Sequence, residues 1–366
     1  MKHNKLKLAS FLGLFITVLM SYWFLRNSHW DEISAHLTGL NAGWVLVATL
    51  ALLLEFVLRA IRWKFVLSPV NGSIPLSGLL SATFIGGALN TLLPARAGDV
   101  ARAVVGSRHT RLPLATVVAT NVMERVYDIF GLVSVLIAML VLIPDEVTNY
   151  GGELVYNLKL YGALFGVAAC LAMGTFLALA SKGEQSKAIF ARLIVVLPKR
   201  LSSKIMVMFD SFIVGFASTR DRRLLWISAG LSVLLWANLA FAVYALFHAF
   251  GLGLPISAAC FTTVVIALTV VVPQAPGFFG VFHVAIEKTM VLWLSAPILG
   301  QTMAAEEPTV QAAKAFAIVF WGVSFVPVTA IGLMAMFREG LTFGTVRQER
   351  KTPDDDGRSL GVDDEE

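Results

Sequence analysis

The chain has 366 residues, of which 57% are hydrophobic and only 14% are charged. Soluble domains are apolar over roughly half of their residues, so this composition excludes a soluble globule and indicates a helical protein with several membrane spans. The net charge of +5 is modest, and the basic residues lie in short segments beside apolar runs. This placement is typical of orientation signals and lipid contacts, so we expect no nucleic-acid partner.

The first two apolar runs predict spans whose basic ends lie in the cytoplasm. Residues 8–25 follow three lysines and end in aromatic residues, without a small-residue cleavage site, which favours a retained span with a cytoplasmic N-terminus. Residues 43–59 form the second span, which ends in a cluster containing Arg59, Arg62 and Lys64. By the positive-inside rule this end is also cytoplasmic.

Residues 75–94 are long enough to cross the membrane, but they contain three glycines and are bounded by prolines. Basic clusters lie on both sides, so a full crossing would place one cluster outside; a re-entrant hairpin from the cytoplasm avoids this. Its end, from Asn90 to Arg102, is polar, broken by proline and rich in arginine. Irregular backbone at membrane depth survives only where protein covers it or it lines a wet cavity, so this stretch is the first candidate for a site.

The third predicted span, residues 114–143, carries ionisable residues in its first half. Glu124 and Asp128 share a helix face, and Arg125 can reach Asp128 three residues later. Ionisable groups at this depth often mark a transport path, although a purely structural charge cluster is the alternative.

The second half of the chain begins with a predicted span over residues 160–180. Gly162, Gly166 and Gly174 form a small-residue stripe there, which favours close helix packing and offers a contact for an oligomer. Residues 182–223 mix basic and apolar residues at helical spacing, so we expect a cytoplasmic loop with amphipathic helices.

Three further regions complete the apolar part of the chain. Residues 224–250 predict the fifth span, and 315–337 predict the last, preceded by an external loop that contains Glu306 and Glu307. Between them, two apolar halves flank a proline-rich break at 273–277, which predicts a second hairpin entering from outside. Cys170 and Cys260 lie in apolar segments, so we expect neither a disulfide framework nor a metal site.

These elements predict an all-α polytopic protein with about six full spans, two re-entrant helical hairpins and an inverted-topology repeat. The inverted halves would be residues 8–143 and 160–337 of one membrane domain, 1–340, followed by a charged, disordered tail, 341–366. Pro94-x-x-x-Gly98 and Pro273-x-x-x-Gly277 occupy equivalent positions in the halves. In each case proline would end one half-helix and glycine would permit the turn into the next.

Four motifs, in order, resemble the lysylphosphatidylglycerol synthase transmembrane-region family, whose members are also called flippase-like domain proteins. They are Arg59-Ala-Ile-Arg62-Trp63, Asn90-x-x-x-Pro94-x-Arg96-x-Gly98-Asp99-x-x-Arg102, Glu124-Arg125-x-x-Asp128 and Pro276-Gly277-x-x-Gly280. The resemblance implies movement of a lipid between leaflets. It also suggests a stand-alone member, because no aminoacyl-transferase domain is attached here. Phe278 and His283 stand where the family often has a glycine and an acidic residue, and His283 would make the site sensitive to pH.

The predicted function is translocation of an anionic phospholipid or polyprenyl-phosphate-type lipid between leaflets of the cell (inner) membrane, with both termini cytoplasmic. Arginine suits this role because its planar fork gives a phosphate two hydrogen bonds at once. The predicted headgroup residues are Arg59, Arg62, Asn90, Arg96, Arg102, Arg125 and His283; Asp99, Glu124 and Asp128 would support them, and Pro94, Gly98, Pro273, Pro276, Gly277 and Gly280 would shape the hairpins.

We expect no catalytic residue, cofactor or metal, and therefore no enzyme. Two alternatives stay open: an integral-membrane transferase that acts on a lipid-linked substrate, and a non-transporting membrane scaffold.

Overall fold

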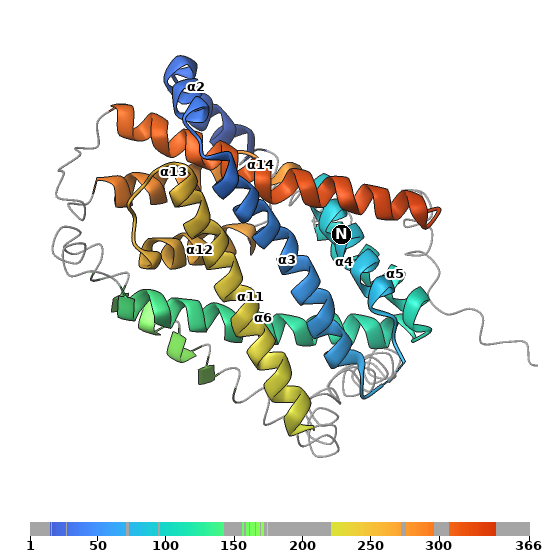
Figure 1. Ribbon diagram of the computed structural model, residues 1–366. Coiled ribbons are helices and arrows are strands. Elements are labelled where there is room, and N and C mark those ends of the chain that lie inside the picture. Colours follow the sequence, from blue (N-terminus) through green and yellow to red (C-terminus); the bar gives the residue numbers. More distant parts are fainter. Residues whose placement is uncertain are drawn as a thin grey trace, which may run out of the picture.

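The computed structural model describes residues 15, 17–26, 28–70, 73–93, 96–142, 221–271, 276–295 and 307–341, with isolated positions between 156 and 174. All regular elements in this described part are helices, which confirms the all-helical fold class (Figure 1). Pro94, Pro273, most of the predicted loop 182–223 and the predicted tail lie outside the described residues.

Five segments of the described chain have the length and hydropathy of membrane spans, as expected for a multi-pass membrane protein. They are α3 (Ala42–Leu67), α6 (Leu114–Leu142), α11 (Arg222–Ala249), the segment Pro276–Leu294 formed by the 3₁₀ turn η2 (Pro276–Phe278) and α13 (Val281–Leu294), and most of α14 (Glu307–Arg338). The shorter helices are α2 (Trp30–Thr38), α4 (Leu76–Leu92), α5 (Ala97–Thr110) and α12 (Ile256–Val271).

Two long helices begin at capping side chains. The Asn41 side chain accepts hydrogen bonds from the amides of Gly43 and Trp44 at the start of α3, at 3.0 and 3.2 Å. Asp221 does the same for two amides at the start of α11. These side chains satisfy amides that have no partner within the helix, so each helix begins at a defined residue.

Two helix boundaries differ from the sequence prediction. α3 continues to Leu67 rather than ending at Arg59, so the whole basic motif lies on the helix. α14 begins at Glu307 rather than 315, and the prediction that Glu307 lies in a loop is wrong. The added turns of α14 make specific contacts: Gln311 accepts a hydrogen bond from the His29 amide, at 3.1 Å.

α3 and α11 form an antiparallel pair through the middle of the molecule (Figure 1). The Asn41 amide at the start of α3 donates to the carbonyl of Ala249 at the end of α11, and Asn238 donates to the carbonyl of Ala51 further along. The α4–α5 pair lies on one side of them and the α12–α13 pair on the other. α14, from the second half, packs on α4, whereas α6, from the first half, packs on α12.

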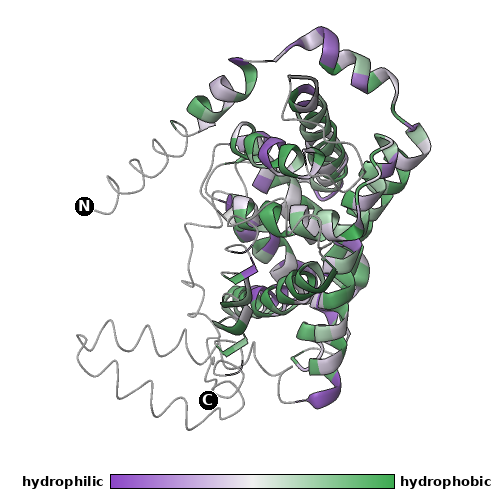
Figure 2. Cartoon of the chain, turned by 90° about the vertical axis from the view of Figure 1, so that its left-hand side faces the viewer, coloured by the Kyte–Doolittle hydropathy of each residue, from purple (hydrophilic) through white to green (hydrophobic). Residues whose placement is uncertain are grey.

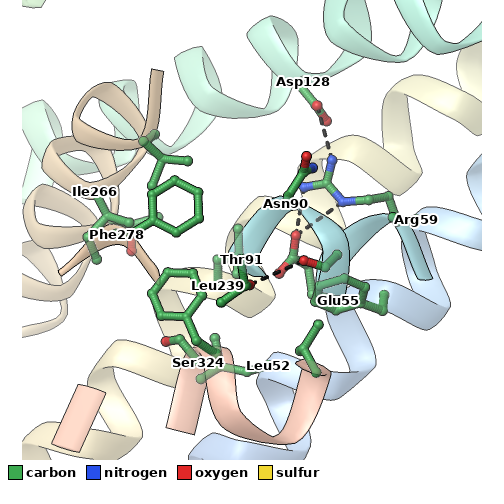
Figure 3. A pocket seen from close by; sticks show the side chains of 18 of the residues that line it. Leu52, Glu55, Arg59, Asn90, Thr91, Asp128, Leu239, Ile266, Phe278 and Ser324 are labelled. Carbon is green, nitrogen blue, oxygen red and sulfur yellow. Dashed lines mark hydrogen bonds and ion pairs between the residues drawn. The ribbon is translucent and has the colours of Figure 1, made fainter. Parts of the chain in front are cut away.

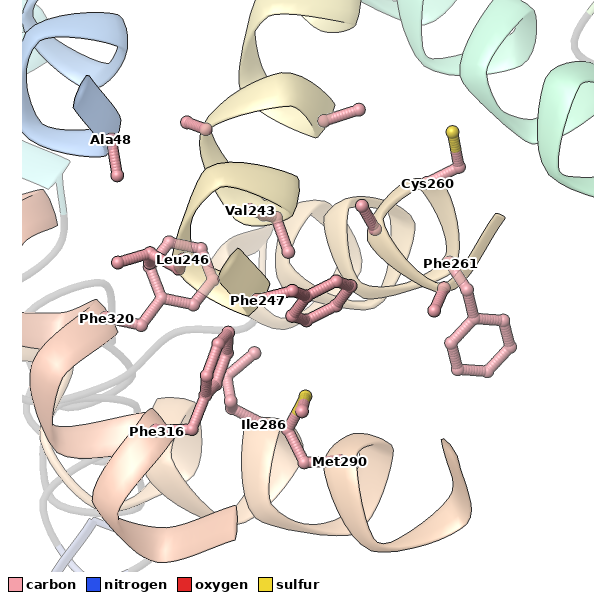
Figure 4. Packing of buried hydrophobic residues seen from close by; sticks show 14 of the residues in the cluster. Ala48, Val243, Leu246, Phe247, Cys260, Phe261, Ile286, Met290, Phe316 and Phe320 are labelled. Atoms are coloured by element: carbon pink, nitrogen blue, oxygen red, sulfur yellow. The ribbon is translucent and has the colours of Figure 1, made fainter. Parts of the chain in front are cut away.

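The outer surface is apolar and the core is aromatic and aliphatic. Leu46, Leu50 and Leu54 are exposed at every fourth position of α3, as a lipid-facing stripe requires. Figure 2 shows hydrophobic residues along most of the helices and hydrophilic residues at several helix ends. Phe247 of α11 packs against Phe316 of α14 in the largest buried cluster (Figure 4).

The predicted glycine stripe lies in the sparsely described segment between 156 and 174. A Cβ at Gly162 or Gly166 would lie 3.4 or 3.8 Å from the Leu136 side chain of α6, in ordinary contact, whereas Gly174 has no neighbour within 4 Å among the described residues. Two of the three glycines therefore lie against the protein's own α6, and an oligomer through this stripe stays a prediction.

Candidate functional site

A cavity of about 440 Å³ lies where the central pair meets both flanking helix pairs. In Figure 3, Glu55, Arg59, Asn90 and Asp128 lie at one side of this cavity, and Ile266 and Phe278 lie at the opposite side. The charged or amide residues that line it are Glu55, Arg59, Asn90, Arg96, Asp99, Arg102, Arg125 and Asp128, and the apolar wall includes Phe56, Leu239, Val243, Ile266, Val270, Phe278, Phe282, Phe320 and Phe325. This division into a charged end and an apolar wall suits a ligand that is itself amphipathic.

The charged end is one connected network. It contains the arginines 59, 62, 96, 102 and 125 and the carboxylates of Glu55, Asp99, Glu124 and Asp128, so it carries one excess positive charge. An excess positive charge in a region of low dielectric attracts anions.

In the deepest layer of this network each arginine forms an ion pair with a buried carboxylate. Arg62 donates to the carboxylate of Asp128 at 2.7 Å and to the hydroxyl of Ser232 on α11 at 2.7 Å. Arg102 pairs with Glu124, with an N–O distance of 2.6 Å, and its guanidinium lies over the Trp63 ring at 4.2 Å. Arg62 does not line the cavity, so the structure places it behind the predicted headgroup residues, where it positions Asp128.

The layer that faces the cavity is more open and its contacts are longer. Arg125 and Arg96 are about 43% and 39% exposed, and each lies 3.4 Å from a carboxylate oxygen of Asp99. Arg59 connects the layers, because it pairs with Glu55 at 2.6 Å and with Asp128 at 3.2 Å. Long, exposed ion pairs contribute little to stability, so Arg96 and Arg125 can exchange the Asp99 carboxylate for an incoming anion at small cost in free energy.

Arg96 has a left-handed backbone, with φ of 54° and ψ of 39°, directly before α5. Glycine was predicted to make this turn, but Gly98 is already within α5 and serves a different purpose. A Cβ at Gly98 would collide with the carbonyl oxygen of Gly86 and with the backbone nitrogen of Asn90. Gly98 therefore lets α4 and α5, the two helices of the first hairpin, touch. The side-chain Nδ2 of Asn90 donates to the Asp99 carboxylate at 2.9 Å across this contact.

We expect Arg96→Gly to be more stable than Arg96→Ala by about 1 kcal/mol, because a left-handed conformation costs an L-residue roughly that much and costs glycine nothing. Thermal unfolding in detergent measures the difference. An alanine variant as stable as the glycine variant would show that position 96 does not keep this conformation.

The second hairpin turns at glycines, as predicted. Gly277 and Gly280 have φ values of 83° and 85°, and the Gly277 carbonyl accepts a hydrogen bond of 2.6 Å from the Trp321 indole. Pro276 begins the short η2 turn, which packs against α4 of the first hairpin. The residues beside both hairpin breaks therefore meet at the cavity, although they lie about 180 positions apart in the chain.

His283 is the predicted headgroup residue that the structure keeps away from the arginines. It is fully buried in the first turn of α13 and does not line the cavity, because the neighbouring Phe282 takes that position. The aromatic wall was missed by the sequence reasoning. Phe278 stands at the predicted break, but Phe282, Phe320 and Phe325 come from regions that look like ordinary span interiors, so no local signal distinguishes these three.

The comparison with known families finds a match that includes the residues of the cavity. Residues 10–332 match the model described as the lysylphosphatidylglycerol synthase TM region. The chain belongs to this family. All four motifs that carry the resemblance lie inside the matched range, and each contributes at least one residue to the cavity or to its charge network.

Outside the family model, one curated relative matches part of the chain. Over 162 residues the chain is 26% identical to Glycosyltransferase AglD of Haloferax volcanii. The match covers 44% of this chain but only 24% of AglD, so this member of the TM region family spans about a quarter of that relative. No solved structure matches the chain.

The side chains at the charged end of the cavity are suited to recognising an anion. Within the described residues, no group of three or more His, Cys, Asp or Glu side chains is arranged to hold a metal ion. The carboxylates of Asp99, Glu124 and Asp128 all contact arginines. What the site offers is a set of guanidinium donors, a small excess of positive charge and an apolar wall beside them.

Proposed function

We propose that this member of the family moves an anionic phospholipid or a polyprenyl phosphate between the two leaflets of the membrane. The observation that carries the proposal is the division of the cavity into a charged end with an excess positive charge and an aromatic, aliphatic wall. An uncompensated charge at the bilayer centre costs about 2.5–3.5 kcal/mol even on insertion scales. A phosphate that crosses beside arginines avoids this cost while its chains stay in apolar surroundings.

The arginines of the open layer receive the phosphate in this proposal. Arg96 and Arg125 share Asp99 over long contacts, so a phosphate oxygen competes with that carboxylate for their donors. Arg59 lies next to them and extends the site towards the apolar wall. The deeper pair of Arg102 and Glu124 stays in place and keeps the floor of the site rigid.

The arrangement of helices supports an inverted repeat. The series α3, α4, α5 and α6 has the same order of long and short helices as α11, α12, α13 and α14. Each hairpin packs on the last helix of the other half, which is the exchange that a two-fold relation between halves produces. Transporter sites commonly lie where such repeats and their broken helices meet. In this proposal both hairpins are re-entrant, and their broken tips form the wall between the leaflets.

The distribution of charge supports cytoplasmic termini. The end of α3 carries Lys64, the start of α11 carries Arg222 and Arg223, and the end of α14 carries Arg338. These ends lie opposite the junction of Asn41 with Ala249, near which α2 carries acidic residues. Basic ends favour the cytoplasm, so in this proposal the first hairpin, α4 and α5, contacts the inner leaflet of the cell membrane.

The test is lipid movement by the purified protein in liposomes. We expect wild-type protein to bring labelled phosphatidylglycerol or polyprenyl phosphate from the inner to the outer leaflet. Arg125→Ala should slow this movement by about 10- to 100-fold, because a hydrogen bond to a charged group contributes about 1.5–3 kcal/mol. Thermal stability should change by no more than about 1 kcal/mol, because Arg125 is exposed.

Arg108→Ala is the matched control, because Arg108 is an exposed arginine of the same hairpin that does not line the cavity. An equal loss of lipid movement in Arg125→Ala and Arg108→Ala would argue for a general effect of surface charge and against a phosphate site.

The similarity to a protein named a glycosyltransferase favours a second candidate, an integral-membrane transferase that acts on a lipid-linked substrate. The same liposomes distinguish the two functions by thin-layer analysis of the lipid. Chemical change of the headgroup supports the transferase, and movement of an unchanged lipid supports translocation. If the lipid neither changes nor moves, the result supports a non-transporting scaffold.

A further inference from the structure

His283 lies in an aromatic enclosure built by three segments of the chain. Its ring centroid is 4.2 Å from that of Phe279, 4.9 Å from Phe24 of the helical residues 17–26, and 5.8 Å from Trp321 of α14. The side chain is fully buried, and neither ring nitrogen has a hydrogen-bond partner among the described residues. Buried polar groups are nearly always paired, so an unpaired imidazole at this depth needs an explanation.

The charged groups around the enclosure are few. Glu287 lies one turn further along α13, on the same face; it is also buried, and its Oε2 has no hydrogen-bond partner in the described part of the chain. Its Oε1 accepts from Lys288 at 3.2 Å. From α14, Lys314 donates to the carbonyl oxygen of Phe24 at 2.8 Å. On the helical residues 17–26 the enclosure meets Phe24, whereas Tyr22 and Arg26 are exposed.

The enclosure is joined to the cavity by two contacts. Trp321, which packs on His283, donates from its indole nitrogen to the Gly277 carbonyl, and the next residue, Phe278, lines the cavity. Phe282 lies between the two sites, because its ring contacts His283 at 6.0 Å between centroids and also lines the cavity. Through Trp321 and Phe282, His283 is therefore linked by direct contacts to the tip of the second hairpin.

We propose that His283 is a proton-binding site that couples proton movement to lipid movement, an inference that rests on the proposed function. The neutral imidazole packs as one more aromatic ring. When a ring nitrogen takes up a proton from the aqueous phase, the surrounding aromatic rings and the buried carboxylate of Glu287, on the same helix face, are the groups available to stabilise the imidazolium. One proton carried with one monoanionic lipid makes the transported pair electrically neutral.

The test uses vesicles of phosphatidylcholine with a trace of labelled phosphatidylglycerol and a pH gradient of one unit. With one proton per lipid, the wild-type protein should concentrate the label in one leaflet towards a ratio of about ten, the factor that corresponds to one pH unit. His283→Phe keeps an aromatic ring but cannot take a proton, so it should only equalise the label. His248→Phe is the matched control, because His248 also stacks on an aromatic ring, Trp44, but is exposed.

Three results would separate the failures. If the wild-type protein equalises the label and ignores the gradient, coupling is overturned while lipid movement stands. If His283→Phe still follows the gradient, the proton site is elsewhere and the assignment is overturned. If no lipid moves, the proposed function fails for phosphatidylglycerol, and ¹⁵N NMR of the histidines tests the proton site independently. A His283 signal that does not titrate between about pH 5 and 8 overturns the proton site. A His283 signal that titrates together with the Trp321 indole supports the proton site.

Discussion

Replacing Glu124 with alanine should destabilise the protein by about 3–5 kcal/mol, the loss typical of removing one partner from a buried ion pair. Glu124 is about 2% exposed and lies within 2.6 Å of Arg102 and 3.6 Å of Arg62. Arg62 would keep Asp128 and Ser232, but Arg102 would keep only the face of Trp63 among the contacts described above. A buried guanidinium without a carboxylate is the source of the loss, and thermal unfolding in detergent measures it.

Two further variants show whether the unpaired charge is responsible. Asp99→Ala removes a carboxylate of the same network that is 37% exposed, and it should cost no more than about 1 kcal/mol. The double variant Arg102→Met with Glu124→Leu removes both charges and should recover much of the stability, because an apolar replacement of a buried pair is often neutral. If the double variant is less stable than Glu124→Ala, burial of an unpaired arginine is not the cause.

Gly98→Ala should separate the two helices of the first hairpin. The new Cβ would meet the Gly86 carbonyl oxygen and the Asn90 amide, and neither backbone atom can rotate away as a flexible side chain would. Overpacking of this kind costs about 1–3 kcal/mol. Because α4 carries Asn90, α5 carries Asp99 and Arg96 directly precedes α5, we also expect lipid movement in liposomes to fall on the order of ten-fold, which corresponds to about 1.4 kcal/mol.

Gly230→Ala is the matched control for this change. Gly230 is also inside a helix, but a Cβ there meets nothing within 4 Å among the described residues. Alanine favours a helix by up to about 1 kcal/mol over glycine, so this variant should be slightly more stable than the wild type. A stabilising effect at both positions would show that the helices of the first hairpin do not touch at Gly98.

The charge network is the part of the site that could be predicted best. Glu124 and Asp128 are four residues apart in one span, and Arg125 is three residues before Asp128, so the shared face of the two carboxylates and the reach of Arg125 to Asp128 follow from the period of the helix alone. The bounds of α4 were predicted closely because prolines flank its apolar run, whereas α3 continues past the charge at Arg59 where the prediction ended it. The early start of α14 was missed because Gln311 is buried through a contact with His29, far away in the sequence.

The orientation of individual arginines could not be predicted. Arg59 and Arg62 are three residues apart on α3, yet Arg59 faces the cavity, and Arg62 points to Ser232 because α11 packs on that side. The aromatic wall and the enclosure of His283 likewise combine side chains from different helices, which in the contact of Phe24 with His283 are far apart in the chain. Such sites exist only after the helices have packed.

α14 packs on α4 of the first hairpin, and α6 packs on α12 of the second. This arrangement determines when each hairpin acquires its final neighbour during synthesis. α4 ends at Leu92, and the helix that covers it begins at Glu307, 215 residues later. The covering contact is intimate, because a Cβ at Gly332 of α14 would collide with the Phe84 carbonyl of α4. During synthesis the first hairpin, α4 and α5, therefore lacks its final neighbour until α14 has left the ribosome. Neither half is a self-sufficient folding unit, and the cavity closes only when the last span arrives.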